Sequence, residues 1–219
     1  MYIDLHTHSI ASDDSKASVE GFAKWSNMLR TRGFRIDGFV LTEHRQFDLS
    51  IDYSELSEKY DILILKGAEL DTDCGHFLVY GINKKICDLI DLEDININAE
   101  YLIDTCIEHS AIAIPAHPGR KGIGLFENLS KYPNILNKIS VIEGLNHSNR
   151  LDEQIKTSNF IKKHKYPSIG GSDSHIVSTI GKCMTHFDDL ITTEKDLVQA
   201  LKSNRYTAVQ IENTTSQKP

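Results

Sequence analysis

Short apolar segments of strand character alternate with segments of helical periodicity along the chain, and histidine or carboxylate side chains recur where the apolar segments end. The expected strands are residues 2–5, 36–41, 62–65, 76–81, 111–115, 139–143, 168–171, 185–187 and 206–211. The expected helices are residues 18–32, 53–60, 99–109, 151–164 and 193–203, with two helical stretches in 125–138 that Pro133 interrupts. This alternation predicts a parallel α/β architecture rather than a β-sandwich, with the polar strand ends gathered along one rim.

The first expected strand leads into two histidines separated by one residue, His6 and His8. Side chains at positions i and i+2 of a strand point to the same face, so the two imidazoles can hold one metal ion from one side. The alternative is that one histidine caps the strand and the other is solvated. Further ligands at other strand ends would favour the metal.

Such ligands recur along the chain. Of the ten histidines, six lie beside expected strand ends or starts, and three carboxylates have equivalent positions: the set is His6, His8, His44, His76, His117, His175, Asp13, Glu69 and Asp173. Imidazole and carboxylate groups without thiolates suit Zn²⁺, Mn²⁺ or Fe²⁺, and this set exceeds the needs of one tetrahedral or octahedral ion. We therefore expect two or three divalent metal ions.

Length and composition fit one globular domain. With 219 residues, of which 40% are hydrophobic and 25% charged, the chain can bury a substantial core. We expect a single domain over residues 1–211 and a disordered tail over 212–219, where little apolar side chain is available for burial. The four cysteines show no paired spacing, so we expect reduced thiols rather than disulfides or a thiolate zinc site.

The sequence contains no segment that predicts membrane association. No apolar run approaches the roughly 18 residues that span a bilayer, and no signal-peptide pattern begins the chain, so we expect a soluble cytoplasmic protein. The net charge of −7 disfavours a long nucleic-acid footprint, which needs a basic stripe. Bound cations would offset part of this charge, so the argument is weak.

Five segments carry a resemblance to a known family: residues 4–9 (Asp-Leu-His-Thr-His-Ser), 42–44 (Thr-Glu-His), 67–69 (Gly-Ala-Glu), 116–118 (Ala-His-Pro) and 171–175 (Gly-Ser-Asp-Ser-His). In order and approximate spacing they resemble the motifs of the PHP family, named for polymerase and histidinol phosphatase, over residues 1–211. The resemblance implies a distorted seven-stranded (β/α) barrel, similar to a TIM barrel, with two or three metals at its C-terminal rim and with phosphoesterase activity. Glu43 departs from the commoner aspartate of its motif.

The resemblance also implies how the ligands divide among the ions. The first ion is expected on His6, His8, Glu69 and Asp173; the second on Glu69, His76 and His117; and the third on Asp13, His44 and His175, with the adjacent Asp14 as the alternative to Asp13. Glu69 then bridges two ions. Glu143 and Asn146 resemble a further family segment at a strand end, where Asn146 either orients a ligand or substrate or has a capping role.

The implied mechanism is attack on phosphorus by a metal-activated hydroxide. A proton on His175 or a metal-bound water would assist the leaving alcohol, and Arg120 and Lys121 would contact non-bridging phosphate oxygens. A solvated basic turn is the alternative for Arg120 and Lys121.

Three functional interpretations remain. The favoured one is a phosphatase acting on a small phosphomonoester. The second is a phosphodiesterase or nuclease acting on nucleotides or RNA ends, and the third is a metal-binding regulatory module without turnover, which the full ligand set disfavours. An amidohydrolase is disfavoured because no lysine lies at an obvious strand end to bridge two metals, whereas Glu69 does.

Overall fold

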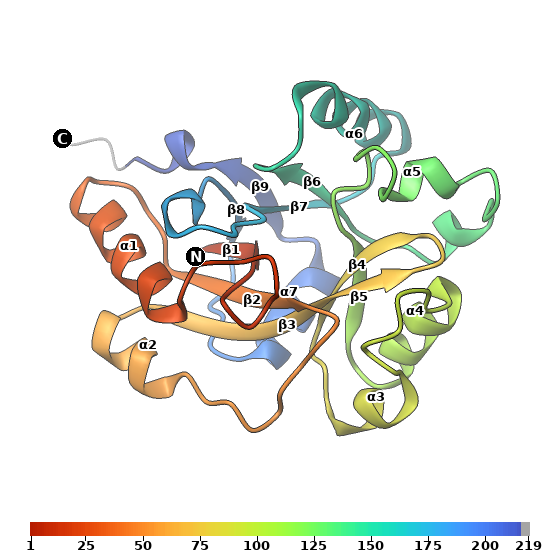
Figure 1. The fold of residues 1–219 in the computed structure, drawn as a ribbon. Coiled ribbons are helices and arrows are strands. Elements are labelled where there is room, and N and C mark those ends of the chain that lie inside the picture. The colour runs from red at the N-terminus through yellow and green to blue at the C-terminus, as the bar shows by residue number, and fades with distance from the viewer. Residues whose placement is uncertain (216–219) are drawn as a thin grey trace.

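The computed structural model of the chain describes residues 1–215. Its strands form a curled half-barrel with helices around it (Figure 1). The strands are β1 (Tyr2–Thr7), β2 (Gly38–His44), β3 (Leu63–Thr72), β4 (Gly75–Tyr80), β5 (Ile112–Pro115), β6 (Ile142–Asn146), β7 (Ser168–Gly171), β8 (Cys183–Phe187) and β9 (Tyr206–Gln210). The helices are α1 (Val19–Thr31), α2 (Ser54–Tyr60), α3 (Lys84–Leu89), α4 (Ala99–Glu108), α5 (Leu125–Asn128), α6 (Leu151–His164) and α7 (Glu194–Ser203).

The main sheet is mixed rather than wholly parallel. It has the strand order β5-β4-β3-β2-β1-β8-β9, and β6 pairs with β7 in a separate two-stranded sheet. The strands β1, β2 and β3 run parallel, as do β6 and β7, whereas β4 and β8 run antiparallel to their neighbours. The α/β class is confirmed, but β4 departs from the parallel prediction because only two residues join it to β3, too few for a parallel crossover.

This mixed topology still brings the predicted ligands to one side of the half-barrel. His44 ends β2 and pairs in register with Glu69 of β3. Because β4 is antiparallel to β3, its first residues lie beside the last residues of β3, which places His76 opposite Asp71. A histidine at the start of a strand therefore reaches the same rim as histidines at strand ends.

Apolar side chains attach the helices to the half-barrel. In α1, for example, Phe22, Ala23 and Leu29 are buried, and the Phe22 ring meets that of Phe39 in β2 edge-on at 5.8 Å. Full burial of one such large apolar side chain contributes about 1.5–3 kcal/mol. Ser18 begins the helix, since its side chain accepts a hydrogen bond from the backbone N–H of Gly21.

Most expected elements are present with shifted ends. One helix was not expected, and one expectation about the C-terminal tail needs correction. The helix α3, which Asn83 caps, was not predicted. Disorder of 212–219 is wrong for its first part, because Ile211–Thr214 form a 3-10 turn and Thr214 Oγ1 accepts a hydrogen bond from the backbone N–H of Arg35 at 3.2 Å. Residues 216–219 of the expected tail lie outside the described residues.

Within residues 1–215, no helix combines the length and the apolar character that crossing a membrane requires.

Candidate metal centre

Eight of the nine residues predicted as metal ligands lie together at the rim. Their ligand atoms form three groups, each with its atoms within 4.8 Å of one another: His6, His8, Glu69 and Asp173; Glu69, His76 and His117; and His8, His44 and His175. Glu69 and His8 each belong to two groups. The structure therefore brings together side chains from β1, β2, β3, β4 and the segments that follow β5 and β7.

The first group is fully buried and close-packed. His6 Nε2 lies 3.0 Å from His8 Nε2 and 3.0 Å from Glu69 Oε2, and His8 Nε2 lies 3.2 Å from the same oxygen. Asp173 Oδ1 is 3.5 Å from both imidazoles. Ligand atoms of both kinds thus surround one small volume.

Glu143 defines which nitrogen of His6 faces that volume. Its Oε1 is 2.9 Å from His6 Nδ1, while its Oε2 accepts hydrogen bonds from the backbone N–H of His117 and from Asn146 Nδ2. Since an ionised carboxylate only accepts, His6 Nδ1 donates to it, and the lone pair of Nε2 then points at His8 and Glu69. Converging lone pairs and carboxylate oxygens fit a divalent cation, and a carboxylate behind a ligating histidine is the usual support.

The second group shares Glu69 with the first, and it uses the other carboxylate oxygen, Oε1. Glu69 Oε1 is 2.8 Å from His117 Nε2 and 3.0 Å from His76 Nδ1. His76 Nε2 faces Asp71 Oδ1 at 3.4 Å, and Arg45 Nη1 bonds the other Asp71 oxygen at 3.2 Å. Asp71 and Arg45 are not among the site residues predicted from the sequence, although Asp71 follows Glu69 by two residues and so shares its face of β3.

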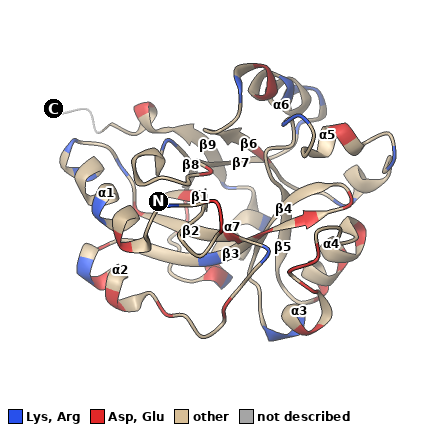
Figure 2. Ribbon diagram, viewed as in Figure 1, with Lys and Arg blue, Asp and Glu red and all other residues tan. Residues whose placement is uncertain are grey.

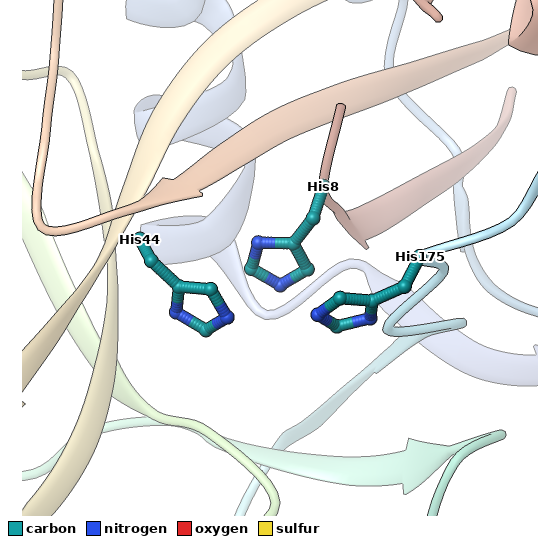
Figure 3. Close-up of side chains that lie close together, drawn as sticks. All are labelled: His8, His44 and His175. Atoms are coloured by element: carbon teal, nitrogen blue, oxygen red, sulfur yellow. The ribbon is translucent and has the colours of Figure 1, made fainter. Parts of the chain in front are cut away.

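The third group contains three imidazoles from separate elements, which point toward one another in Figure 3. His8 stacks on His44 and on His175, with ring centroids 4.2 and 4.4 Å apart. Asp14 Oδ2 lies 3.4 Å from His44 Nε2 and 3.2 Å from His175 Nε2. An acidic side chain therefore accompanies the two histidines.

That acidic side chain is Asp14, and the choice of Asp13 needs correction. Asp13 is 80% exposed and lies 3.8 Å from Arg45 Nη2. The reason is the turn that carries both residues: Ser12 Oγ donates to Glu43 Oε2 at 2.6 Å and Ser15 Oγ donates to the carbonyl of His8 at 2.6 Å. These two anchors turn the half-exposed Asp14 toward His44 and His175 and Asp13 toward Arg45, and Glu43 is the acceptor that holds the turn.

The buried carboxylates and imidazoles of the centre shift one another's pKa values. Burial alone would raise the pKa of Glu69, but the imidazoles of His6 and His117 hold it well below its usual value. Burial likewise opposes a charged His6, yet the carboxylates of Asp173 and Glu143 raise the pKa of this imidazole well above its ordinary value. Without a cation, these carboxylates therefore favour a second proton on His6, at Nε2; a bound cation would take the place of that proton and meet the Nε2 lone pair.

Backbone geometry at two site residues shows that the local conformation is held by its surroundings. His117 has φ of 29° and Asp173 φ of 54°, in a region that residues with a side chain seldom adopt. Beside them, a Cβ at Gly171 would lie 2.3 Å from His6 Cβ and 2.9 Å from Glu143 Oε1. Glycine at this position therefore lets β7 approach β1 closely enough for His6 and Glu143 to meet.

Arg120, predicted to contact phosphate, lies at the edge of the same centre. Its Nη2 bonds Asp173 Oδ2 at 2.7 Å and Asn146 Oδ1 at 3.1 Å, and its Nε donates to Asn149 at 3.2 Å. These bonds fix the guanidinium beside a proposed ligand. Asn146, one of the two residues singled out at the end of the strand, thereby contacts both Arg120 and Glu143.

Comparisons with known proteins find a family-model match to part of the chain and solved structures with a similar fold. A family model described as PHP-associated matches residues 156–206. A two-domain protein from Bacteroides vulgatus ATCC 8482, described as containing a predicted PHP-like metal-dependent phosphoesterase, has a TM-score of 0.63 and 18% identity over 97% of this chain and 65% of its own. This chain thus spans less than two thirds of that relative.

Two further solved structures share the fold. PsfC from Pseudomonas syringae PB-5123 has a TM-score of 0.71 and 16% identity, covering 97% of this chain and 92% of its own. The lesion-specific endonuclease PfuEndoQ from Pyrococcus furiosus has a TM-score of 0.65 and 15% identity, covering 92% of this chain and 56% of its own. No curated protein matches the chain significantly in sequence. The chain is therefore similar to the PHP-associated family over residues 156–206 and shares its fold with a protein described as PHP-like.

Proposed function

We propose that the chain is a metal-dependent phosphoesterase and, more specifically, a phosphatase that hydrolyses a small phosphomonoester. The observation that carries the proposal is the convergence of three ligand groups on one rim, with Glu69 shared between two of them. The proposed ligands are His6, His8, Glu69 and Asp173 for one ion, Glu69, His76 and His117 for a second, and Asp14, His44 and His175 for a third. Zn²⁺, Mn²⁺ and Fe²⁺ suit this donor set.

Ions bound there would supply hydroxide at neutral pH and offset charge on the phosphate oxygens. The side chains of the protein would position the ligands and the substrate phosphate and supply the proton for the leaving alcohol. Glu143 keeps His6 in the tautomer whose Nε2 faces the centre, and Asp71 lies 3.4 Å from His76 Nε2, on the side of this ring away from Glu69. Arg120 donates three hydrogen bonds to its neighbours, and its remaining N–H groups would bind non-bridging phosphate oxygens.

His175 is the most exposed imidazole among the proposed ligands, at 29%, and has two roles that depend on the number of ions. Its Nδ1 faces the carbonyl of Asp173 at 3.0 Å, so Nε2 is the atom that faces the centre. If two ions were bound, Nε2 would be available to donate a proton to the leaving alcohol. If three were bound, Nε2 would instead be a ligand.

A second candidate function is that of a phosphodiesterase or nuclease acting on nucleotides or RNA ends. The fold shared with a lesion-specific endonuclease favours it. Against it, Lys and Arg alternate with Asp and Glu over the helices in Figure 2, and the net charge is −7, whereas a strand-binding surface needs a basic track. The phosphatase therefore remains the preferred proposal, and the converging ligands disfavour a module without turnover.

The proposal also includes two further points, the form of the barrel and the cellular location. One is that the half-barrel and the β6–β7 pair form a distorted barrel, which is supported by two hydrogen bonds that join β1 and the residue after it to the segment after β7: Asp173 N to the carbonyl of His6 at 2.7 Å, and His8 N to the carbonyl of Ser174 at 2.9 Å. A cytoplasmic location is supported by the four cysteines, all of which are unpaired thiols.

The choice between monoester and diester can be tested directly with two aryl esters. We expect the metal-loaded protein to hydrolyse p-nitrophenyl phosphate with kcat/KM at least about tenfold above that for bis(p-nitrophenyl) phosphate. A monoester dianion offers three terminal oxygens to cations, whereas a diester offers two and adds a second bulky group. Preference for the diester, or efficient degradation of single-stranded RNA at moderate salt, would favour the nuclease.

Two adjacent aspartates provide a matched test of the third ligand group. Asp14→Asn is expected to lower the metal content by up to one ion per chain, because the Asp14 carboxylate lies beside both His44 and His175. Asp13→Asn removes the same charge one residue away and is expected to leave the metal content unchanged, as its carboxylate is exposed. Elemental analysis of the purified variants measures this. Equal loss in the two variants would contradict the assignment.

A further inference from the structure

The imidazole of His76 lies between two carboxylates. Its Nδ1 is 3.0 Å from Glu69 Oε1, and its Nε2 is 3.4 Å from Asp71 Oδ1. Glu69 belongs to two of the ligand groups, whereas Asp71 belongs to none of the three. Nδ1 is therefore the nitrogen that faces the second ligand group, and a proton on Nε2 is on the side of Asp71.

The register of β3 and β4 places Asp71 beside His76. The two residues lie directly opposite each other across this antiparallel pair, and side chains at such positions share one face of the sheet. Asp71 Oδ1 is buried and has no hydrogen-bond partner within the described part of the chain. A buried acceptor without a donor is unfavourable, and a small shift of the imidazole would let the Nε2 proton satisfy it.

Arg45 holds Asp71 through the oxygen that does not face His76. Its Nη1 donates to Asp71 Oδ2 at 3.2 Å, and its backbone N–H donates to the carbonyl of Glu69 at 2.8 Å. The φ of Arg45 is 52°, in the left-handed region that favours glycine, so its surroundings hold this conformation. The other nitrogen, Nη2, lies 3.8 Å from the exposed carboxylate of Asp13, a pair that contributes little. The main partner of the guanidinium is therefore Asp71.

We propose that Arg45 is a positioning residue that acts through Asp71. Arg45 fixes the Asp71 carboxylate, and that carboxylate orients the imidazole of His76 with Nδ1 toward the second ligand group. This rests on the ligand role of His76 in the proposed function and gives roles to two residues outside the ligand set. Asp71 then supports the second group as Glu143 supports the first.

The direction of one effect separates this role from simple electrostatics. Arg45→Gln removes a positive charge beside a cation site, which by itself would strengthen metal binding. Loss of the bond to Asp71 is expected to weaken metal binding instead, with Kd about tenfold higher for one ion, as measured by competition with a chelator. The matched control is Arg205→Gln, which removes the same charge and a bond to Asp189 at the start of β9. The control is expected to keep the Kd of the wild type.

Double variants test whether the effect passes through the imidazole. Asp71→Asn is expected to raise Kd at least as much as Arg45→Gln does, and the two changes together no more than Asp71→Asn alone. In a His76→Ala background, Arg45→Gln is expected to have no further effect. In zinc-loaded protein with ¹⁵N-labelled histidine, the Nε2–H signal that His76→Ala removes is expected to exchange faster with water in Arg45→Gln.

None of these measurements needs turnover, so their outcome is independent of whether any ester is hydrolysed. Unchanged or tighter metal binding in Arg45→Gln would overturn the inference, as would equal weakening in the His76→Ala background. A higher KM for a phosphomonoester with unchanged metal affinity would also overturn it, in favour of direct contact between Arg45 and the substrate.

Discussion

Replacement of Glu69 by glutamine is expected to lower kcat/KM for a phosphomonoester by on the order of a thousandfold and to remove more metal than substitution of any histidine that belongs to a single ligand group. One oxygen of Glu69 faces His6 and His8, and the other faces His76 and His117. Glutamine removes the charge and replaces one of these acceptors by an NH₂ donor, so two ligand groups lose a partner at once. Elemental analysis and steady-state kinetics measure the two effects.

Two comparisons make the Glu69 result specific. His76→Ala removes a ligand from only one group, so it is expected to lower the metal content by less than Glu69→Gln does. Glu108→Gln makes the same chemical change at an exposed position at the end of α4 and serves as the control. Full metal occupancy in Glu69→Gln would contradict a carboxylate shared by two ions.

The second large effect is expected from Glu143→Gln, which leaves every proposed ligand in place. Metal affinity should fall by about 10- to 100-fold, as is typical when the group behind a ligating histidine is changed. The Glu143 carboxylate accepts from His6 Nδ1, from the backbone N–H of His117 and from Asn146. A glutamine NH₂ group would place a hydrogen-bond donor opposite one of these donors. His6 would then no longer be held in the tautomer whose Nδ1 carries the proton.

This substitution should also lower the free energy of unfolding by about 1–3 kcal/mol, because a buried donor loses its acceptor. Competition with a chelator measures the affinity, and denaturant unfolding in EDTA measures the stability without a contribution from bound metal. Unchanged metal affinity together with reduced stability would show that Glu143 has only a structural role. Glu108→Gln is again the matched control.

The sequence predicts the ligands better than the contacts that hold them. Strand ends of parallel strands meet at one edge, so histidines after separate apolar runs can be predicted to converge. Asp13 and Asp14 could not be distinguished, because a turn has no periodicity and the anchors Ser12 and Ser15 act through the distant Glu43 and the carbonyl of His8.

Other features depend on tertiary structure in the same way. Glu143 lies at the end of an expected strand, but its contact with His6, 137 residues earlier, depends on how β7 brings β6 and β1 together. The helix α3 was missed because it is only six residues long and begins with Lys84 and Lys85, which give it little apolar periodicity. Asp71 could have been predicted, since it lies two residues after Glu69 on one strand and therefore faces the same side of the sheet.

The first ligand group joins residues near the two ends of the fold, from His6 to Asp173. The centre can therefore assemble only after β1 and the segment following β7 have met. A cation held there acts as a cross-link between distant segments, and it stabilises the folded chain by mass action in proportion to RT ln(1 + [M]/Kd). The proteolytic lifetime of the protein and the supply of its metal are consequently coupled through the same four side chains.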